Sequence, residues 1–209
     1  NGYAIGKDIT NVERFRHRGV VYMTLCHNGN NDICGSARYN EEELGVSTFG
    51  EQVIKEMNRV GMMVDISHAG EKSFYDALEI SSKPIVASHS SARALCDHPR
   101  NLTDDQLKAL AAKGGVAQVC MYGGFLRKNG EATIKDAIEH LNHMVNVMGI
   151  EHVGIGTDFD GDGGITGCAS ASELINFTRR LLLERYSGES IRLIWGGNFL
   201  RVMEEVQRK

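Results

Sequence analysis

Two histidines in this chain each follow a short apolar segment that is rich in β-branched residues. His68 follows residues 62–67 and His89 follows residues 84–88, with one expected helix between them. This spacing predicts a strand-helix-strand unit, in which the carboxyl ends of adjacent parallel strands lie at the same edge of a sheet. Histidines at such ends are common metal ligands in α/β barrels, although a single one is more often structural. Because two occur in equivalent positions, the sequence predicts that His68 and His89 bind a metal ion.

Two more apolar segments are followed directly by an ionisable residue, His27 in one case and Asp158 in the other. Four such strand ends in register favour one shared site at the mouth of a barrel. Two histidines and a carboxylate suit zinc-assisted hydrolysis, in which the metal lowers the pKa of bound water to about 7. Arg100 lies in the loop after His89, and its planar guanidinium suits a substrate carboxylate. Four further histidines are expected on the surface: His17, His98, His140 and His143.

Residues 158–163 also match the first half of a calcium-binding loop of the D-x-D-x-D-G type. The match fails at the twelfth position, where Ala169 replaces the bidentate glutamate, and a strand instead of a helix precedes the segment. A third interpretation is that Asp160 and Asp162 only turn the chain. We favour that interpretation for these two aspartates.

Five apolar segments are expected to form strands, and a helix with one apolar stripe is expected after each. The strands are 20–26, 62–67, 84–88, 116–122 and 152–157. The helices after them are 48–60, 71–80, 103–113, 133–148 and 170–186, with further helices around 9–15 and at 198–208. Capping boxes at Thr48–Glu51 and Thr103–Gln106 predict two of the helix starts. Residues 191–196 are ambiguous between a helix and a short connection.

This alternation of strands and helices predicts a parallel sheet with right-handed crossovers. Five units fit either an open doubly wound sheet or the last five-eighths of a (β/α)8 TIM barrel. A complete barrel usually takes about 250 residues. If the fold is a barrel, we therefore expect its first three β/α units to be absent from this chain.

The composition is that of a soluble globular protein. With 209 residues, of which 42% are hydrophobic and 24% charged, residues 1–209 are expected to form a single domain. The net charge of −4 and the pI near 6.1 argue against nucleic acid as a partner. Since no apolar segment approaches the roughly 18 residues that a membrane helix needs, no membrane span is expected.

The five cysteines are an odd number and form no CxxC pair. This pattern indicates neither a disulfide framework nor a cysteine zinc site, so free thiols are expected. Free thiols favour the cytoplasm, while a periplasmic or secreted location stays open if a signal peptide has been removed. Because the chain begins at Asn1 without methionine, we expect its amino terminus to be incomplete.

The segments around the candidate residues resemble the membrane (renal-type) dipeptidases, peptidase family M19. They are residues 22–27, 64–68, 88–91, 99–101, 156–161 and 197–202. The resemblance implies an amidohydrolase-like (β/α)8 barrel with two zinc ions that hydrolyses dipeptides, including some with a carboxyl-terminal D-residue. Some members of the family also open β-lactam-type rings. The resemblance covers the whole chain, and its ordered set of motifs is specific.

The resemblance also implies a role for each candidate residue. His68 and His89 would bind one zinc ion, and Asp158 would be the acid/base residue that also meets the substrate amine. His27 would polarise the scissile carbonyl and bind the developing oxyanion, and Arg100 would hold the substrate carboxylate. These roles agree with the needs of amide hydrolysis, which are an oxyanion donor and a positively charged clamp.

Part of the family's metal site is not in this sequence. The family has a His-x-Asp pair on its first strand and a metal-bridging glutamate on its third, and residues 1–5 resemble the segment directly after that glutamate. The remaining zinc ligands are therefore expected outside this chain. Two alternatives stay open: another barrel-type metal-dependent amidohydrolase, such as a deaminase or lactonase, and a metal-free fragment with a non-catalytic role. A dipeptide is the expected partner, and a homodimer is kept open.

Overall fold

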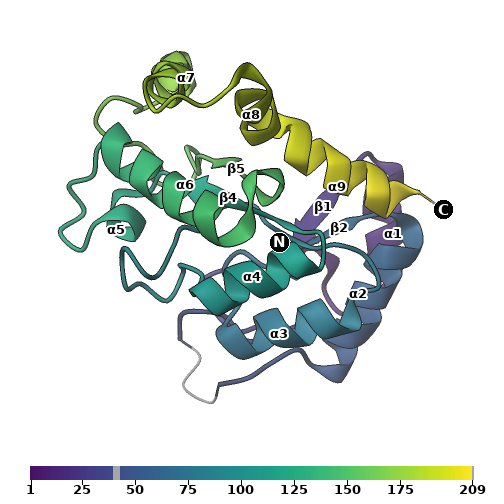
Figure 1. The fold of residues 1–209 in the computed structure, drawn as a ribbon. Helices are drawn as coiled ribbons and strands as arrows, with labels where there is room; N and C mark the ends of the chain where they lie inside the picture. The colour runs from purple at the N-terminus through teal and green to yellow at the C-terminus, as the bar shows by residue number, and fades with distance from the viewer. Residues whose placement is uncertain (40–42, 209) are drawn as a thin grey trace. The chain divides into compact units, whose positions relative to one another are not determined.

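The computed structural model describes residues 1–39 and 43–208, and contacts between residues divide the chain into two compact units (Figure 1). The first unit comprises Asn1–Ala87, Ala112–Gly115 and Leu200–Lys209. The second comprises Ser88–Ala111 and Val116–Phe199. The prediction of a single domain over residues 1–209 stays a prediction.

Three parallel strands form the centre of the first unit. They are β1 (Tyr22–Thr24), β2 (Met63–Asp65) and β3 (Val86–Ala87). β1 pairs with β2 with Thr24 opposite Asp65, and β2 pairs with β3 with Asp65 opposite Val86. All three residues of β2 are buried, as expected for a strand that is covered on both faces. The strands are shorter than the apolar segments that predicted them.

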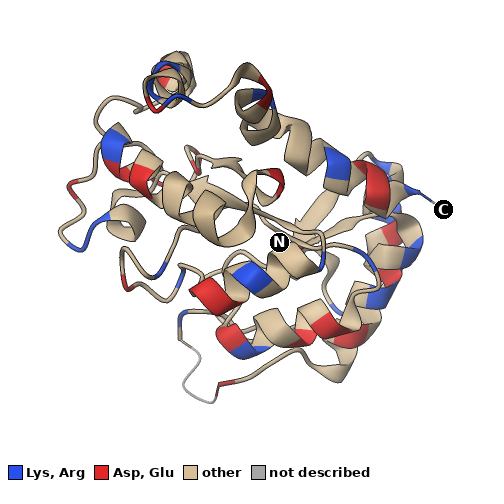
Figure 2. Ribbon diagram, in the orientation of Figure 1, with Lys and Arg blue, Asp and Glu red and all other residues tan. Residues whose placement is uncertain are grey.

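Helices in the first unit follow the strands in the predicted order. They are α1 (Thr10–His17), α2 (Thr48–Val60) and α3 (Glu71–Ile80), after a short 3-10 helix at Gly2–Ile5. The buried face of α2 includes Val53, Ile54 and Met57, and its exposed face carries interspersed acidic and basic residues (Figure 2). The helix ends at Gly61, whose φ of 74° is left-handed, so the predicted glycine stop is confirmed.

The start of α2 corrects one detail of the sequence analysis. The capping residue is Ser47, whose backbone is extended and whose hydroxyl accepts a hydrogen bond from the N–H of Gly50 at 2.9 Å. Thr48 is the first helical residue, so the capping box predicted at Thr48–Glu51 is wrong by one position. Both residues are β-hydroxyl residues that favour caps, and only the backbone conformation distinguishes them.

The second unit contains β4 (Val116–Cys120) and β5 (Val153–Gly156), which pair in parallel. A threonine directly precedes each of its helices α4 (Asp104–Ala112) and α6 (Ile134–Met148). Thr103 and Gln106 exchange side-chain to backbone hydrogen bonds at 3.2 and 2.9 Å, so the predicted capping box at α4 is confirmed. The sequence analysis missed α5 (Gly123–Leu126), a single turn after β4.

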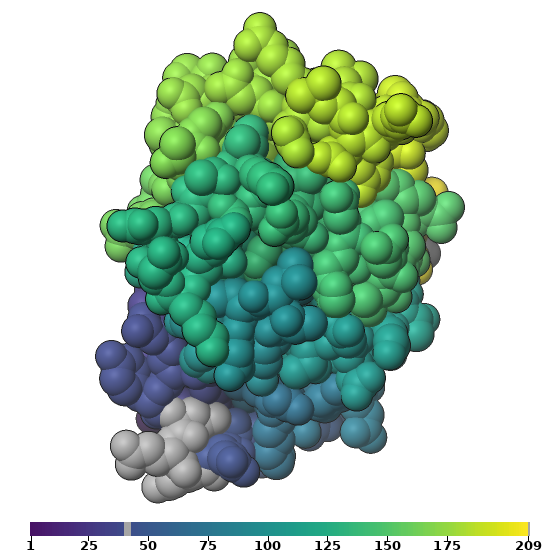
Figure 3. All heavy atoms as spheres, turned by 60° about the vertical axis from the view of Figure 1, so that its left-hand side comes forward, coloured from purple at the N-terminus to yellow at the C-terminus, as the bar shows by residue number. Residues whose placement is uncertain are grey.

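The C-terminal part of the chain is helical almost throughout. α7 (Leu174–Leu183) follows short 3-10 turns, and α8 (Gly188–Arg192) continues through a π-helical turn at Leu193–Gly197 into α9 (Asn198–Gln207). The ambiguous residues 191–196 are therefore helical up to a kink at Gly196, whose backbone is not helical. Figure 3 shows the yellow-green side chains of this region at the surface, and the exposed apolar ones on α7 are Ile175, Leu182 and Leu183.

The prediction that His140 lies on the surface is wrong. It is 1% exposed and lies on the buried face of α6 with Ala137, Leu141 and Met144. Its Nδ1 accepts a hydrogen bond from the N–H of Ala92 at 3.1 Å. Its other ring nitrogen, Nε2, donates to the carbonyl of Leu126 at 3.2 Å. His140 is therefore a structural core residue whose two ring nitrogens are both bonded to main chain.

All five cysteines are buried free thiols, which confirms that part of the sequence analysis. They are Cys26, Cys34, Cys96, Cys120 and Cys168. Among the helices of residues 1–39 and 43–208, none combines the length and the apolar character that crossing a membrane requires.

Candidate active site

His27 and His68 lie side by side in the first unit. Thr24 of β1 is opposite Asp65 of β2, and each histidine follows its strand partner by three residues. The two side chains therefore leave the sheet at the same carboxyl edge. Their rings stack with centroids 4.2 Å apart and an interplanar angle of 27°. The structure brings these two predicted site residues together.

His68 has an unusual backbone conformation. Its φ is 71°, in the left-handed region that residues other than glycine rarely occupy. The carbonyl of His68 accepts a hydrogen bond from the N–H of Ala37 at 2.7 Å, which helps to hold this conformation. Such strain costs about 1–3 kcal/mol and persists only where surrounding contacts fix it, which occurs often at functional sites.

A buried serine joins the two histidine backbones. The Ser36 hydroxyl oxygen lies 2.7 Å from the carbonyl oxygen of His27 and 3.3 Å from that of His68, and Ser36 is 1% exposed. A hydroxyl has one proton, so the shorter contact is the main hydrogen bond and the longer one shares it. Ser36 is itself held by Asn30, whose Oδ1 accepts from its N–H at 2.8 Å. The loop after β1 therefore fixes both histidines.

The ring of His68 is oriented by the same loop. Its Nδ1 lies 3.1 Å from Oδ1 of Asn28, directly after His27. An amide oxygen accepts hydrogen bonds, so this contact is compatible with a proton on Nδ1 and a lone pair on Nε2. Histidines that bind metals through one nitrogen usually donate from the other to an oxygen acceptor. His68 therefore fits a metal ligand that binds through Nε2.

His89 and Asp158 belong to the second unit. The Ser88 hydroxyl oxygen lies 2.7 Å from Nδ1 of His89, so this histidine also has an oxygen partner on Nδ1. The backbone of Ser88 approaches β5 closely, since a Cβ built on Gly156 would lie 1.8 Å from the Ser88 carbonyl oxygen. Only glycine fits at that contact. It allows the His89 segment to lie against the strand that leads to Asp158.

Asp158 follows β5 in a tight turn. Its φ is 58°, and its carbonyl accepts hydrogen bonds from the N–H groups of Gly161 and Gly163. A side chain at Gly163 would lie 2.2 Å from the carbonyl oxygen of Thr157, so the turn requires glycine there. Asp160 lies exposed in the same turn, in agreement with the turn interpretation of the aspartate-rich segment.

The carboxyl group of Asp158 lies in a partly buried environment with charges nearby. Burial raises its pKa above the usual value, while the nearby positive charges of His89 and Arg100 lower it and Asp160 raises it. The net direction is upward. The Cys120 thiol donates a hydrogen bond to Asp158 Oδ2 at 3.8 Å, and burial raises the pKa of that thiol to about 12.

Arg100 is buried next to this group. It is 3% exposed, and its guanidinium carbon lies 5.2 Å from the centre of the Phe125 ring. Its backbone N–H donates to Nδ1 of His98 at 3.1 Å, which holds the loop after the His89 segment. A buried arginine over an aromatic ring is rigid, as a residue that binds a carboxylate must be.

The predicted site residues thus form two groups, one in each unit. His27 and His68 stack in the first, and His89, Arg100 and Asp158 lie within electrostatic reach of one another in the second. In the described part of the chain, no three His, Cys, Asp or Glu side chains are arranged to hold one metal ion. The prediction that His68 and His89 share a metal ion therefore stays a prediction.

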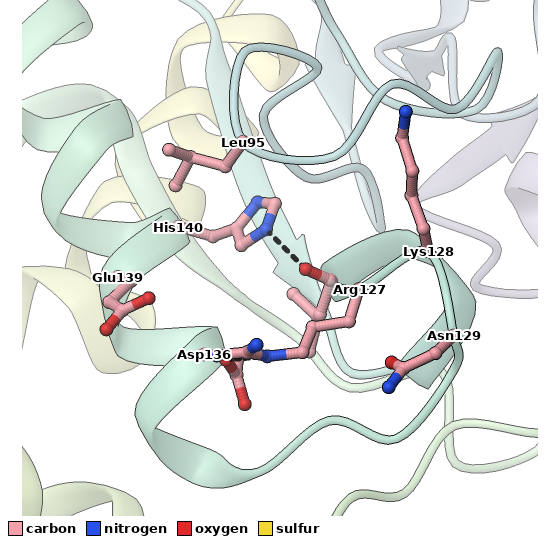
Figure 4. Close-up of a pocket in the computed structure, with 8 residues that line it drawn as sticks. Leu95, Arg127, Lys128, Asn129, Asp136, Glu139 and His140 are labelled. Carbon is pink, nitrogen blue, oxygen red and sulfur yellow. Dashed lines mark hydrogen bonds and ion pairs between the residues drawn. The ribbon is translucent and has the colours of Figure 1, made fainter.

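A cavity of about 460 Å³ in the second unit is separate from these residues (Figure 4). It lies beside α6, with Arg127 paired to Asp136 at its floor. The other lining residues are Leu95, Leu126, Lys128, Asn129, Glu139 and His140. Its acidic and basic groups are paired or balanced, and none of the predicted site residues lines it.

The sequence analysis missed four residues that support the site. Asn28 and Ser36 hold the histidines of the first unit, and Ser88 and Cys120 contact His89 and Asp158 in the second. Asn28 and Ser88 are adjacent in sequence to a site histidine, which is the signal that would have found them. Ser36 and Cys120 carry no such signal, since only the fold brings them to the site.

Comparisons with known proteins show what this chain is similar to. The family model described as membrane dipeptidase, peptidase family M19, matches residues 1–209. An uncharacterised dipeptidase of Schizosaccharomyces pombe is 40% identical over 204 residues, which are 94% of this chain and 49% of that protein. The chain spans about half the length of the curated relatives it matches.

Two solved structures have the same fold. The probable dipeptidase PvdM of Pseudomonas aeruginosa is 29% identical with a TM-score of 0.94, over 99% of this chain and 68% of that one. A metallo peptidase of Rhodobacter sphaeroides, solved with a phosphinate mimic of the dipeptide L-Ala-D-Ala, is 28% identical with a TM-score of 0.90, over 97% of this chain and 60% of that one. These likenesses confirm the predicted fold class, an amidohydrolase-like (β/α)8 barrel of which this chain is a part.

Proposed function

Because the chain belongs to the membrane dipeptidase family, peptidase family M19, we propose that the protein hydrolyses the peptide bond of dipeptides. The observation that carries this proposal is the buried Arg100 in the second unit, within electrostatic reach of Asp158 together with His89, both of which are half-buried. An arginine and an acid at close quarters match the two charged ends of a dipeptide. The Rhodobacter sphaeroides relative was solved with a mimic of such a molecule.

His68 and His89 are the residues of this chain that would hold zinc. Both present an imidazole whose Nδ1 already has an oxygen partner, which fits ligation through Nε2. When bound, zinc supplies a water of lowered pKa and polarises a carbonyl group. Zinc usually takes four ligands, so two histidines are an incomplete set. We propose two zinc ions in the complete site, with the remaining ligands outside this chain.

The other residues act on the substrate. Arg100 binds the free carboxylate of the dipeptide through paired N–H donors, which fixes the position of the scissile bond. His27 donates a hydrogen bond to the carbonyl oxygen as negative charge develops on it. Asp158 takes a proton from the attacking water and later gives one to the leaving amine, while its charge also attracts the substrate amine.

The loop after β1 gives His27 the rigidity that this role requires. Its carbonyl is held by Ser36, and its ring is stacked on His68. A donor that is fixed before the reaction needs no reorganisation when the oxyanion forms, and one such donor contributes about 10²–10³ in kcat.

Metal analysis and peptide hydrolysis on the full protein test this proposal together. We expect about two zinc ions in each complete site, as proposed above, and cleavage of a panel of small dipeptides such as L-Ala-D-Ala. A chelator should abolish the cleavage, and added zinc should restore it. Bound metal without cleavage of any dipeptide would instead support another amidohydrolase reaction, and a protein without metal or activity would overturn the proposal.

A further inference from the structure

The loop after β1 contacts His68 at both its backbone and its ring. Ala37 and Ser36 hold the carbonyl, and Asn28 holds Nδ1. The stacked ring of His27 restricts rotation of the His68 ring. With φ fixed at 71° and one face of the ring covered, the ring nitrogen that faces Asn28 is Nδ1. The side chain of residue 28 therefore lies against one specific nitrogen of the imidazole, Nδ1.

We propose that Asn28 is a positioning residue that fixes the tautomer of His68, with the proton on Nδ1 and the lone pair on Nε2. This inference rests on the proposed function, in which Nε2 is the atom of His68 that would bind zinc. The carbonyl oxygen of Asn28 accepts the proton of Nδ1 at 3.1 Å. If the amide were rotated by 180°, its NH2 group would donate to Nδ1 and the proton would move to Nε2, where it would oppose metal binding.

His140 provides an internal reference for the opposite tautomer. Its Nδ1 accepts from the N–H of Ala92, and its Nε2 donates to the carbonyl of Leu126, so its proton lies on Nε2. Main-chain groups set this tautomer, and they do not change when residue 28 is substituted. His140 belongs to the second unit and is 1% exposed, so its signal also reports whether that part of the protein is folded.

The first experiment measures the tautomers directly in the full protein with 15N-labelled histidine. Long-range 1H–15N spectra of the metal-free form distinguish Nδ1–H from Nε2–H, and the His68 signals are assigned by their loss in His68→Gln. In the wild type we expect Nδ1–H for His68 and Nε2–H for His140. In Asn28→Ala, the His68 signals should move toward Nε2–H while those of His140 stay unchanged.

Two further variants complete this comparison. In Asn28→Asp the carboxylate still accepts from Nδ1, so the Nδ1–H tautomer of His68 should be retained. In Asn129→Ala, a control at an exposed asparagine in the second unit, no histidine should change. An Nε2–H tautomer for His68 in the wild type would overturn the proposal, as would an Nδ1–H tautomer that survives in Asn28→Ala. If Asn28→Ala fails to fold, Asn28→Leu replaces it.

The second experiment titrates the metal-free protein with Zn²⁺ in a calorimeter. Loss of a residue that orients a metal-binding histidine typically weakens metal affinity about 10–100-fold, so we expect this for Asn28→Ala and little change for Asn28→Asp. The two proposals fail in different ways. A wild type that binds no zinc but has the expected tautomers would overturn the proposed function alone. If Asn28→Ala leaves both the zinc affinity and the His68 tautomer unchanged, the positioning role alone is overturned.

Discussion

His68 and His140 are both buried, 9% and 1% exposed, but the groups around them differ. Main-chain groups bond to both ring nitrogens of His140, within the regular geometry of α6. His68 lies after a strand, has a left-handed backbone and is oriented through Nδ1 by a side-chain amide. Bonds from main chain on both sides make a histidine part of the scaffold. An oxygen acceptor on one nitrogen, together with local strain, is typical of a histidine that acts on a ligand.

The same contrast separates two arginines of the second unit. Arg100 is buried over Phe125 beside Asp158, whereas the Arg127 side chain is 53% exposed and pairs with Asp136 at the start of α6. Burial of a charge is costly unless its surroundings compensate for it, so a buried arginine near an acid points to function more strongly than an arginine whose side chain is half exposed.

The largest effect is expected from His68→Ala. Removal of a metal ligand should lower kcat/KM of the full protein for dipeptides by at least about 10³-fold, because metal ions contribute several kcal/mol to hydrolysis. Zinc content should fall in parallel. His17→Ala, at an exposed histidine on α1, is the control and should retain both. A His68→Ala protein with normal activity would show that the comparison with His140 was drawn wrongly.

A smaller loss of activity is expected from Arg100→Met. The substrate carboxylate would lose its paired donors, which lowers kcat/KM by about 10²–10³-fold, since charge-assisted hydrogen bonds of this kind contribute roughly 1.5–3 kcal/mol each. Arg127→Met should leave kcat/KM unchanged and change the free energy of unfolding by less than about 1 kcal/mol. Steady-state kinetics on both variants measure the difference. Equal losses in the two variants would remove the distinction between the arginines.

The pH dependence of stability tests whether His140 is a buried structural residue. Burial lowers the pKa of His140 to about 4, whereas in the unfolded chain it is near 6.5. Between these values the unfolded chain binds a proton that the folded chain does not, so stability falls as the pH falls. The contribution is fully present above pH 6.5 and is lost by about pH 4, and it amounts to about 3 kcal/mol.

His140→Gln should remove this component of the pH dependence. The amide of glutamine does not titrate, so the free energy of unfolding should decrease less between pH 6.5 and 4 than in the wild type. Urea unfolding at several pH values gives the slopes. His17→Gln, at an exposed position, should keep the wild-type slope. A slope that is the same in His140→Gln and in the wild type would mean that burial does not lower the pKa of His140.

Much of this arrangement could be predicted from the sequence, because apolar segments that end at His27, His68 and Asp158 indicate strand ends. The fold class followed from the alternation of strands and helices together with the resemblance, and it is confirmed. His140 could have been placed correctly, since it is spaced three residues after Ala137 and four before Met144 on the apolar face of α6. It was expected on the surface because it lies on a helix without a partner in register, but main-chain hydrogen bonds to both ring nitrogens compensate for its burial.

Other features depend on the folded backbone and have no signal in the sequence. Whether Ser36 contacts two histidines is decided by how the loop after β1 returns to the sheet. The left-handed conformations of His68 and Asp158 could not be located from the sequence, because His and Asp are enriched at positive φ but adopt it at few of their positions. The meeting of His68 with His89 stays a prediction, and the variants above test its consequences.

The smallest effect is expected at the start of α2, which positions no chemistry. Ser47→Ala removes the oxygen that accepts from the N–H of Gly50 and should lower the free energy of unfolding by about 1 kcal/mol. Thr48→Ala, at the first helical residue, should change it by no more than a few tenths of a kcal/mol, because alanine has the higher helix propensity. Urea unfolding compares the two variants, and both should keep wild-type kcat/KM. A larger decrease in the free energy of unfolding for Thr48→Ala than for Ser47→Ala would support the capping box first predicted at Thr48–Glu51. It would also show that backbone conformation alone does not identify the capping residue.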